Sequence, residues 1–280
     1  TECFVIEYDG EEILYIPVDS MSTLSPYIGN QEIKLDSLSK NNWKIKKEKS
    51  EKKAYDIAAE LLEAEAKRKI EKSDQLSISD KNKYELFKDG FGFTETVDQK
   101  ITISQVTNDL SISKPQDRLV CGEVGFGKTE IALRASFICT ENLKQVCILA
   151  PTTILARQHF ELFKERFENF DVKVDFLSRE RSQKEKSKII EELKNGDISI
   201  IIGTHSLLSD SITFADLGLL VIDEEHRFGV RQKEKLRNLK KGVNVIYLSA
   251  TPIPRSLNLA LSKVRDISII SSPPPGRKTV

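Results

Sequence analysis

One stretch of sequence indicates the fold of this chain more clearly than any other. It reads Leu119-Val120-Cys121-Gly122-Glu123-Val124-Gly125-Phe126-Gly127-Lys128-Thr129. Its last eight residues match the GxxxxGK[ST] pattern of a phosphate loop. Three apolar residues typical of a strand precede the pattern, and a helix-like stretch over 129–140 follows it. Glycines let the backbone N–H groups of such a loop turn toward phosphates, and the helix N-terminus adds partial positive charge. A Gly-rich turn that matches by accident is the alternative, and it does not explain this context.

Two further groups of residues complete the predicted site. Lys128 would reach the β and γ phosphates of a nucleotide, and Thr129 would place its hydroxyl on Mg²⁺. The stretch 219–226, Leu-Leu-Val-Ile-Asp-Glu-Glu-His, delivers carboxylates to the end of an apolar strand. Asp223 would hold Mg²⁺ through its hydration shell, and Glu224 would orient and deprotonate the attacking water. A surface acidic cluster without a metal would not need four apolar residues before it.

The remainder of the chain from about residue 86 alternates apolar strands with amphipathic helices. This alternation predicts a doubly wound parallel α/β sheet covered on both faces. Helices are predicted over 129–140, 154–169 and 182–195. Strands are predicted at 119–121, 146–150, 174–177, 198–202, 219–222, 245–248 and 267–270.

Short polar clusters follow several of these strands and should share one edge of the sheet. They are Pro151-Thr152-Thr153, Gly203-Thr204-His205 and Ser249-Ala250-Thr251. In open α/β sheets the ligand crevice lies beyond the carboxyl ends of the strands, so the clusters predict one working surface. Each cluster taken alone could equally be a helix N-cap.

Composition limits the classes of function. Lys+Arg and Asp+Glu both number 43, so the chain is not a general polycation, and any nucleic-acid surface must be local. No apolar run reaches the ~18 residues that a membrane span needs. Four cysteines (Cys3, Cys121, Cys139 and Cys147) without CxxC spacing indicate reduced thiols in a cytoplasmic protein.

The first 72 residues differ in texture from the rest. Phe4-Val5-Ile6 and Ile13-Leu14-Tyr15-Ile16 flank Asp9-Gly10, which predicts a β-hairpin. A long Lys- and Glu-rich helix is expected over 43–71. A solvated helix face is the favoured interpretation of its lysines, and a nucleic-acid or partner contact is the alternative.

The order of GFGKT, PTT, GTH, DEEH and SAT resembles the first RecA-like lobe of superfamily 2 helicases and translocases. The stretches 223–230 and 250–255 are similar to the branch shared by RecG and the Mfd family of transcription-repair coupling factors. Phe126 in the phosphate loop favours the Mfd family, since RecG-like chains usually carry Ser there. The stretch 14–18 also resembles the end of that family's CarD-like, RNA-polymerase-interacting domain, and 43–62 resembles its joining helix.

The resemblance implies a domain order and further site residues. It divides the chain into 1–40 (end of the polymerase-interacting β domain), 41–85 (linker helix region), 86–272 (ATP-binding lobe) and 273–280 (start of an interlobe linker). Gln99 would bond the adenine edge and Phe93 would pack on the ring, although an ordinary loop and helix start explains them too. The complete set implied for nucleotide binding is Phe93, Thr96, Gln99, Gly122, Glu123, Val124, Gly125, Phe126, Gly127, Lys128, Thr129 and Glu130. Val97 stands where the family has Pro, and Glu123 replaces the usual Asp.

The resemblance also implies roles at the strand ends. Residues implied in phosphate contacts with one DNA strand are Thr152, Thr153, Arg157, Gln158, Thr204 and His205. Ser249 and Thr251 would link the state of the γ-phosphate to movement of the lobe. Arg179 and Arg181 are further DNA candidates, though a solvated turn explains them as well.

The function that the resemblance implies is an ATP- and Mg²⁺-dependent translocase on double-stranded DNA. It would displace stalled RNA polymerase and help recruit nucleotide excision repair proteins. The alternatives are a RecG-like fork-remodelling translocase and a nucleotide-gated polymerase-binding module without turnover. Because the family's arginine fingers belong to a second lobe, these 280 residues alone are expected to bind ATP and hydrolyse it barely.

Overall fold

A computed structural model describes residues 3–7, 13–17, 71–179, 181–224, 228, 232, 235–236, 239, 242–250 and 265–274. The chain divides into two compact units, Thr1–Glu63 and Ala64–Val280. In the first, β1 (Cys3–Glu7) pairs antiparallel with β2 (Ile13–Pro17), as the predicted hairpin requires. The Asp9-Gly10 turn, and the helix predicted over 43–71 apart from its last residue, lie outside the described residues.

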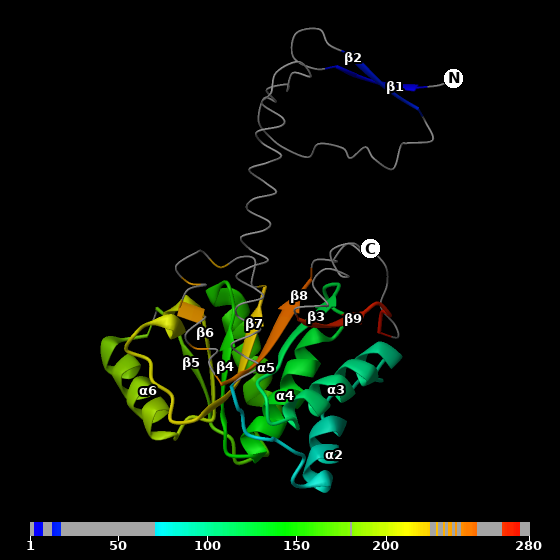
Figure 1. The fold of residues 1–280 in the computed structure, drawn as a ribbon. Coiled ribbons are helices and arrows are strands. Elements are labelled where there is room, and N and C mark those ends of the chain that lie inside the picture. The colour runs from blue at the N-terminus through cyan, green and yellow to red at the C-terminus, as the bar shows by residue number, and fades with distance from the viewer. Residues whose placement is uncertain are drawn as a thin grey trace. The chain divides into compact units, whose positions relative to one another are not determined.

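Seven strands of the second unit form one sheet in the order β5-β6-β4-β7-β8-β3-β9 (Figure 1). Each pairing of neighbouring strands is parallel, so all the strands end at the same edge. All seven overlap predicted strands. They are β3 (Asp117–Gly122), β4 (Gln145–Leu149), β5 (Val174–Leu177), β6 (Ile200–Gly203), β7 (Leu217–Asp223), β8 (Asn244–Ser249) and β9 (Asp266–Ile270).

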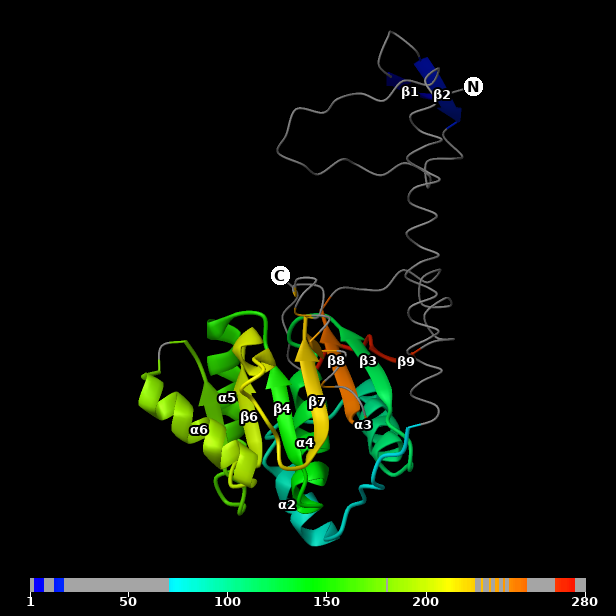
Figure 2. The same cartoon turned by 60° about the vertical axis from the view of Figure 1, so that its left-hand side comes forward.

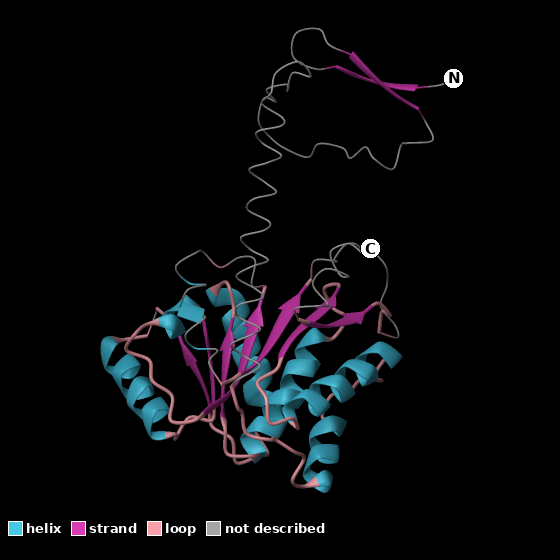
Figure 3. Cartoon of the chain, in the orientation of Figure 1, coloured by secondary structure: helices cyan, strands magenta, loops and turns pink. Residues whose placement is uncertain are grey.

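Helices precede and connect these strands (Figure 3). They are α2 (Lys81–Asp89), α3 (Val97–Leu110), α4 (Lys128–Glu141), α5 (Thr153–Arg166), α6 (Gln183–Asn195) and the 3₁₀ helix η2 (His205–Leu208). Local signals explain their ends: Ser182 and Glu185 form a capping box at α6, and Gly196 ends that helix in a left-handed conformation. Helix α5 ends three residues earlier than predicted, because Phe167 and Phe170 pack into an aromatic cluster with Phe87.

Both faces of the sheet are covered, which confirms the predicted doubly wound fold. Val146 and Ile148 of β4 belong to a hydrophobic cluster under α2, α3, α4 and α5. Cys147 and Leu149, which alternate with them along β4, belong to a second cluster that includes residues of α6 and η2. Figure 2 shows helices on both sides of the sheet. Alternate residues of one buried strand thus serve two layers of helices.

The four cysteines are all free, and Cys121, Cys139 and Cys147 are buried, as their spacing predicted. Burial raises the pKa of the Cys121 thiol to about 11. Among the described residues, no helix has the length and apolar character needed to cross a membrane.

Candidate nucleotide site

The phosphate loop joins β3 to α4, as its sequence predicts. Gly125 and Gly127 have φ values of 83° and 80°, a left-handed region that favours glycine. The Nζ atom of Lys128 donates to the carbonyl oxygens of Gly122 and Glu123, at 2.6 Å and 2.9 Å. The loop therefore holds the lysine charge at the N-terminus of α4, where backbone amides and the helix dipole also favour anions.

Gln99 connects the start of α3 to this loop. Its Nε2 atom donates to the carbonyl oxygen of Phe126 at 2.9 Å, and its Oε1 atom accepts from the Thr96 amide at 2.8 Å. The side chain is only 2% exposed, so it joins α3 to the phosphate loop, which differs from the predicted contact with the adenine edge. Thr96 is the N-cap of α3 and forms a capping box with Gln99, so the predicted helix start is confirmed. A Cβ atom on Gly127 would lie 2.3 Å from Gln99 Nε2. Gly127 is thus required by close approach as well as by its backbone conformation.

The two carboxylates predicted for catalysis stand at the end of β7. Asp223 Oδ2 lies 3.0 Å from Nε2 of His159, a residue of α5. Glu224 has a φ of 52°, which is uncommon for a residue with a side chain and often marks a functional position. Its Oε1 atom accepts from the Ala250 amide at 2.7 Å, which ties the carboxylate to the residue after β8.

Sequence reasoning missed His159. The histidines are scattered along the chain, and no motif singles out this one. It becomes recognisable only when α5 brings its imidazole beside Asp223. The contact orients the carboxylate that would serve the metal, as partners of metal-ligating groups commonly do.

The donor set at this edge suits Mg²⁺. This ion prefers oxygen ligands and is usually bound by one or two carboxylates together with substrate phosphates and waters. Thr129 contributes a hydroxyl from the first turn of α4, and Asp223 contributes a carboxylate. This hydroxyl and carboxylate therefore fit Mg²⁺ bound together with nucleotide phosphates.

Several residues predicted to contact DNA lie around the start of α5. Thr152 is the N-cap of α5, its hydroxyl accepting from the Leu155 amide at 3.3 Å, so the helix-cap interpretation holds for it. Thr153, Arg157 and Gln158 line one groove of about 490 Å³, together with Ile154, Glu161 and Phe176. The structure thus brings three of the predicted contacts to one surface.

The cluster after β6 differs in accessibility. Thr204 is only 3% exposed, so its hydroxyl is not presented to a ligand as predicted. His205 begins η2 and contacts Arg179, a further DNA candidate. Burial, and then the Arg179 charge, lower the pKa of His205 below its ordinary value. Ser249 ends β8 near Glu224's partner Ala250, whereas Thr251 lies outside the described residues.

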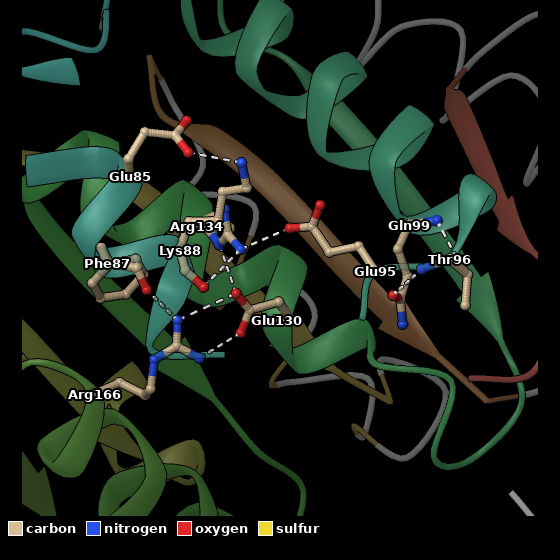
Figure 4. Close-up of polar contacts among 9 residues, drawn as sticks. All are labelled: Glu85, Phe87, Lys88, Glu95, Thr96, Gln99, Glu130, Arg134 and Arg166. Carbon is tan, nitrogen blue, oxygen red and sulfur yellow. Dashed lines mark hydrogen bonds and ion pairs between the residues drawn. The ribbon is translucent and has the colours of Figure 1, made fainter. Parts of the chain in front are cut away.

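Glu130 and Phe93, both predicted to bind the nucleotide, differ in their exposure to solvent. Glu130 is 3% exposed, and its carboxylate accepts from Arg134 at 2.6 Å and from Arg166 at 2.7 Å (Figure 4). This side chain therefore joins α4 to α5, which differs from the predicted nucleotide contact. Phe93 is 75% exposed and lies edge-on to Phe91, with ring centroids 5.4 Å apart. An exposed ring of this kind is free to pack on a base.

Comparisons with known proteins indicate the family of this chain. A family model described as "DEAD/DEAH box helicase" matches residues 96–260. The transcription-repair-coupling factor of Haemophilus influenzae is 46% identical over 281 residues, which cover 100% of this chain and 24% of that protein. The Escherichia coli factor is 45% identical over the same shares, and the Bacillus subtilis factor is 44% identical over 97% of this chain and 23% of its own length. The chain thus spans about a quarter of these curated relatives.

Solved structures with the same fold include helicases on DNA. A structure titled "Structure of RecG bound to three-way DNA junction" has a TM-score of 0.68 and 35% identity, over 80% of this chain and 31% of that one. The DUF1998 helicase MrfA bound to DNA matches at a TM-score of 0.52 and 18% identity, over 73% of this chain and 32% of that one, a likeness of fold alone.

Proposed function

Because the chain belongs to the DEAD/DEAH box helicase family, we propose that it is the nucleotide-binding lobe of an ATP-driven translocase on double-stranded DNA. The family resemblance drawn from the sequence motifs is confirmed. The observation that carries the proposal is the shared edge of the sheet. There the phosphate loop follows β3, while Asp223 ends β7, two strands away, and Glu224 follows it. Nucleotide and metal would meet at this edge.

The residues at this edge divide the work of hydrolysis. Lys128 presents a positive charge to the β and γ phosphates. Glu224, held by the Ala250 amide, orients the attacking water and accepts its proton. Thr129 and Asp223 would hold Mg²⁺, which neutralises charge on the phosphates when bound. His159 acts on Asp223 as a positioning residue.

The same edge explains how hydrolysis could drive movement. The hydrogen bond between Ala250 and Glu224 connects the hydrolytic carboxylate to Ser249-Ala250, the segment implied in coupling. The groove beside Thr153, Arg157 and Gln158 presents a hydroxyl, a guanidinium and an amide. Such groups bind a sugar-phosphate backbone without reading bases. We therefore propose phosphate contacts with no preference for sequence.

The biological setting follows from the relatives. We propose that the protein acts in transcription-coupled repair and displaces stalled RNA polymerase through the β domain whose end is formed by residues 1–40. It would also help recruit excision repair proteins. Support comes from identities of 44–46% with transcription-repair-coupling factors along nearly all of the chain. The RecG likeness, at 35% identity over 80% of the chain, supports a rival role in fork remodelling. Release of stalled polymerase and regression of a model fork are the assays that separate the two.

Nucleotide binding is the direct test of the proposal. The chain is titrated with a fluorescent ATP analogue in the presence of Mg²⁺, and phosphate release is then followed with and without duplex DNA. We expect saturable binding that Lys128→Ala abolishes, and slow release, because an arginine finger from a second lobe is worth roughly 10³–10⁵ in rate. A chain that binds no nucleotide would overturn the proposal. Brisk release that survives Lys128→Ala would indicate a contaminating ATPase.

A further inference from the structure

A buried charge cluster lies beside the loop 90–96, which connects α2 to α3. The cluster consists of Glu95, Glu130, Arg134 and Arg166 (Figure 4). The side chain of Arg134 is 2% exposed; its Nε atom donates to Glu130 at 2.6 Å and its Nη2 atom to Glu95 at 2.7 Å. Arg166 donates to the other carboxylate oxygen of Glu130 at 2.7 Å. Two positive and two negative groups balance, as burial of charge demands.

The two arginines also bind the end of α2. Arg166 Nη2 donates to the carbonyl oxygen of Phe87 at 2.8 Å, and its guanidinium lies 4.7 Å from the centroid of the Phe87 ring. Arg134 contacts the carbonyl oxygen of Lys88 at 3.5 Å. Helix C-termini carry unsatisfied carbonyls and partial negative charge, so guanidinium groups stabilise them. The start of the loop is therefore held by α4 and α5.

The other end of the loop 90–96 is anchored to α4 and to the phosphate loop that precedes this helix. Glu95 immediately precedes Thr96, the N-cap of α3, and Gln99 one turn later donates to the phosphate-loop carbonyl of Phe126. Arg134 belongs to α4, the helix that starts at Lys128 of the phosphate loop. Two contacts thus fix the position of the loop 90–96 relative to the phosphate loop and α4: Glu95 with Arg134, and Gln99 with Phe126. Phe93 lies two residues before Glu95, between the Glu95 contact and the anchored end of α2, and is exposed.

We propose that Glu95 and Arg134 are positioning residues that set the loop 90–96 at the correct distance from the phosphate loop for recognition of a purine base. This inference rests on the proposed nucleotide-binding function and deepens it. Neither side chain touches the nucleotide. Their ion pair holds the loop that carries exposed Phe93, so its loss should weaken the contribution of the base to affinity and spare that of the phosphates. A cluster that served only folding would not distinguish a base-bearing ligand from one without a base.

The test compares two ligands that share a chain of three phosphates and differ in the adenosine group, the base with its ribose, which only ATP carries. ATP and inorganic tripolyphosphate are titrated calorimetrically, with Mg²⁺, into the wild-type chain and into Glu95→Gln. We expect Glu95→Gln to bind ATP about tenfold more weakly, since a hydrogen bond to a charged partner is worth that much, and to bind tripolyphosphate as the wild type does. Glu85→Gln is the matched control and should alter neither affinity, because Glu85 pairs with the exposed ammonium group of Lys88, at 2.8 Å, on the surface beside the cluster.

A second variant keeps the test decisive if Glu95→Gln unfolds. Glu95→Asp retains the charge that Arg134 requires and shortens the side chain by one methylene, so the loop should shift while the fold is kept. It too should lose affinity for ATP alone. Equal losses for both ligands, or no loss for either, would overturn the positioning role. A wild type that binds neither ligand would instead overturn the proposed function. Equal wild-type affinities for the two ligands would show that the adenosine group is not recognised, and would overturn the positioning role.

Discussion

Lys128 and Glu224 perform separate tasks that single substitutions can distinguish. Lys128→Ala removes the charge that faces the phosphates, so binding and hydrolysis should both be lost. Glu224→Gln keeps the shape of the side chain and loses the base, so the nucleotide should remain bound while single-turnover release falls by about 10²–10⁴. Analogue binding and quenched-flow phosphate release measure the two effects. Equal release from wild type and Glu224→Gln would contradict the role assigned to the carboxylate.

Gly127 is constrained twice, and a second glycine separates the two constraints. Gly127→Ala would strain a backbone at φ 80° and place a Cβ atom 2.3 Å from Gln99 Nε2. Gly92 has a similar φ of 68° with no atom within 4 Å, so Gly92→Ala should cost only the strain, about 1–2 kcal/mol. Chemical denaturation should show Gly127→Ala to be the less stable variant. Equal free energies of unfolding would indicate that Gln99 adjusts without cost.

At the scale of elements, Asp98 fastens the first turn of α3 to the chain after β9. Its Oδ2 atom accepts from the Ser271 amide, the Ser272 amide and the Ser272 hydroxyl, at 2.9, 2.8 and 2.6 Å. The Ser272 hydroxyl and then the two amides lower the pKa of Asp98 below its ordinary value. Because the carboxylate is partly solvated, Asp98→Asn should lower the free energy of unfolding by only about 1 kcal/mol at neutral pH.

The stabilisation by Asp98 should depend on pH in one direction: it weakens as the pH falls. The pKa of Asp98 is lower in the folded state than in the unfolded state, so its contribution is complete above the unfolded value of about 3.9. It is lost as the pH falls further, through the folded pKa. The difference in unfolding free energy between wild type and Asp98→Asn should therefore narrow below about pH 4. The control is Asp171→Asn, at an exposed position. Its unfolding free energy should equal that of the wild type both at neutral pH and below about pH 4.

For the molecule as a whole, the proposed DNA surface predicts a shallow dependence on salt. Each cation that neutralises a phosphate contributes about −0.9 to the slope of log affinity against log salt, whereas hydroxyl and amide contacts contribute little. Arg157→Gln should therefore reduce the slope by about 1. Lys188→Gln is the control, because the Lys188 side chain on α6 is 75% exposed and lies outside the proposed surface, and it should leave the slope unchanged. Fluorescence anisotropy with duplexes of different sequence measures the slope, and a strong base preference would argue against phosphate contacts.

The sequence by itself determined the features that depend on neighbours along the chain. Spacing, glycine content and apolar runs act over a few residues. They were enough to predict the phosphate loop, the carboxylates at the end of β7 and the alternation of seven strands with helices. A parallel arrangement then places every strand's carboxyl end at one edge, so the working surface could also be predicted. Thr96 and Gln99 were recognisable as a helix start, because a capping box is a local pattern.

The tertiary structure decided which distant residues meet. His159 became a partner of Asp223 only through the packing of α5, and the strand order placed β8 between β3 and β7. Glu130 directly follows the phosphate-loop motif in sequence, yet its carboxylate accepts hydrogen bonds from Arg134 and Arg166. Such pairings are set by burial, because a charge removed from water must find an opposite charge from whichever element packs against it. No local pattern encodes the identity of that element.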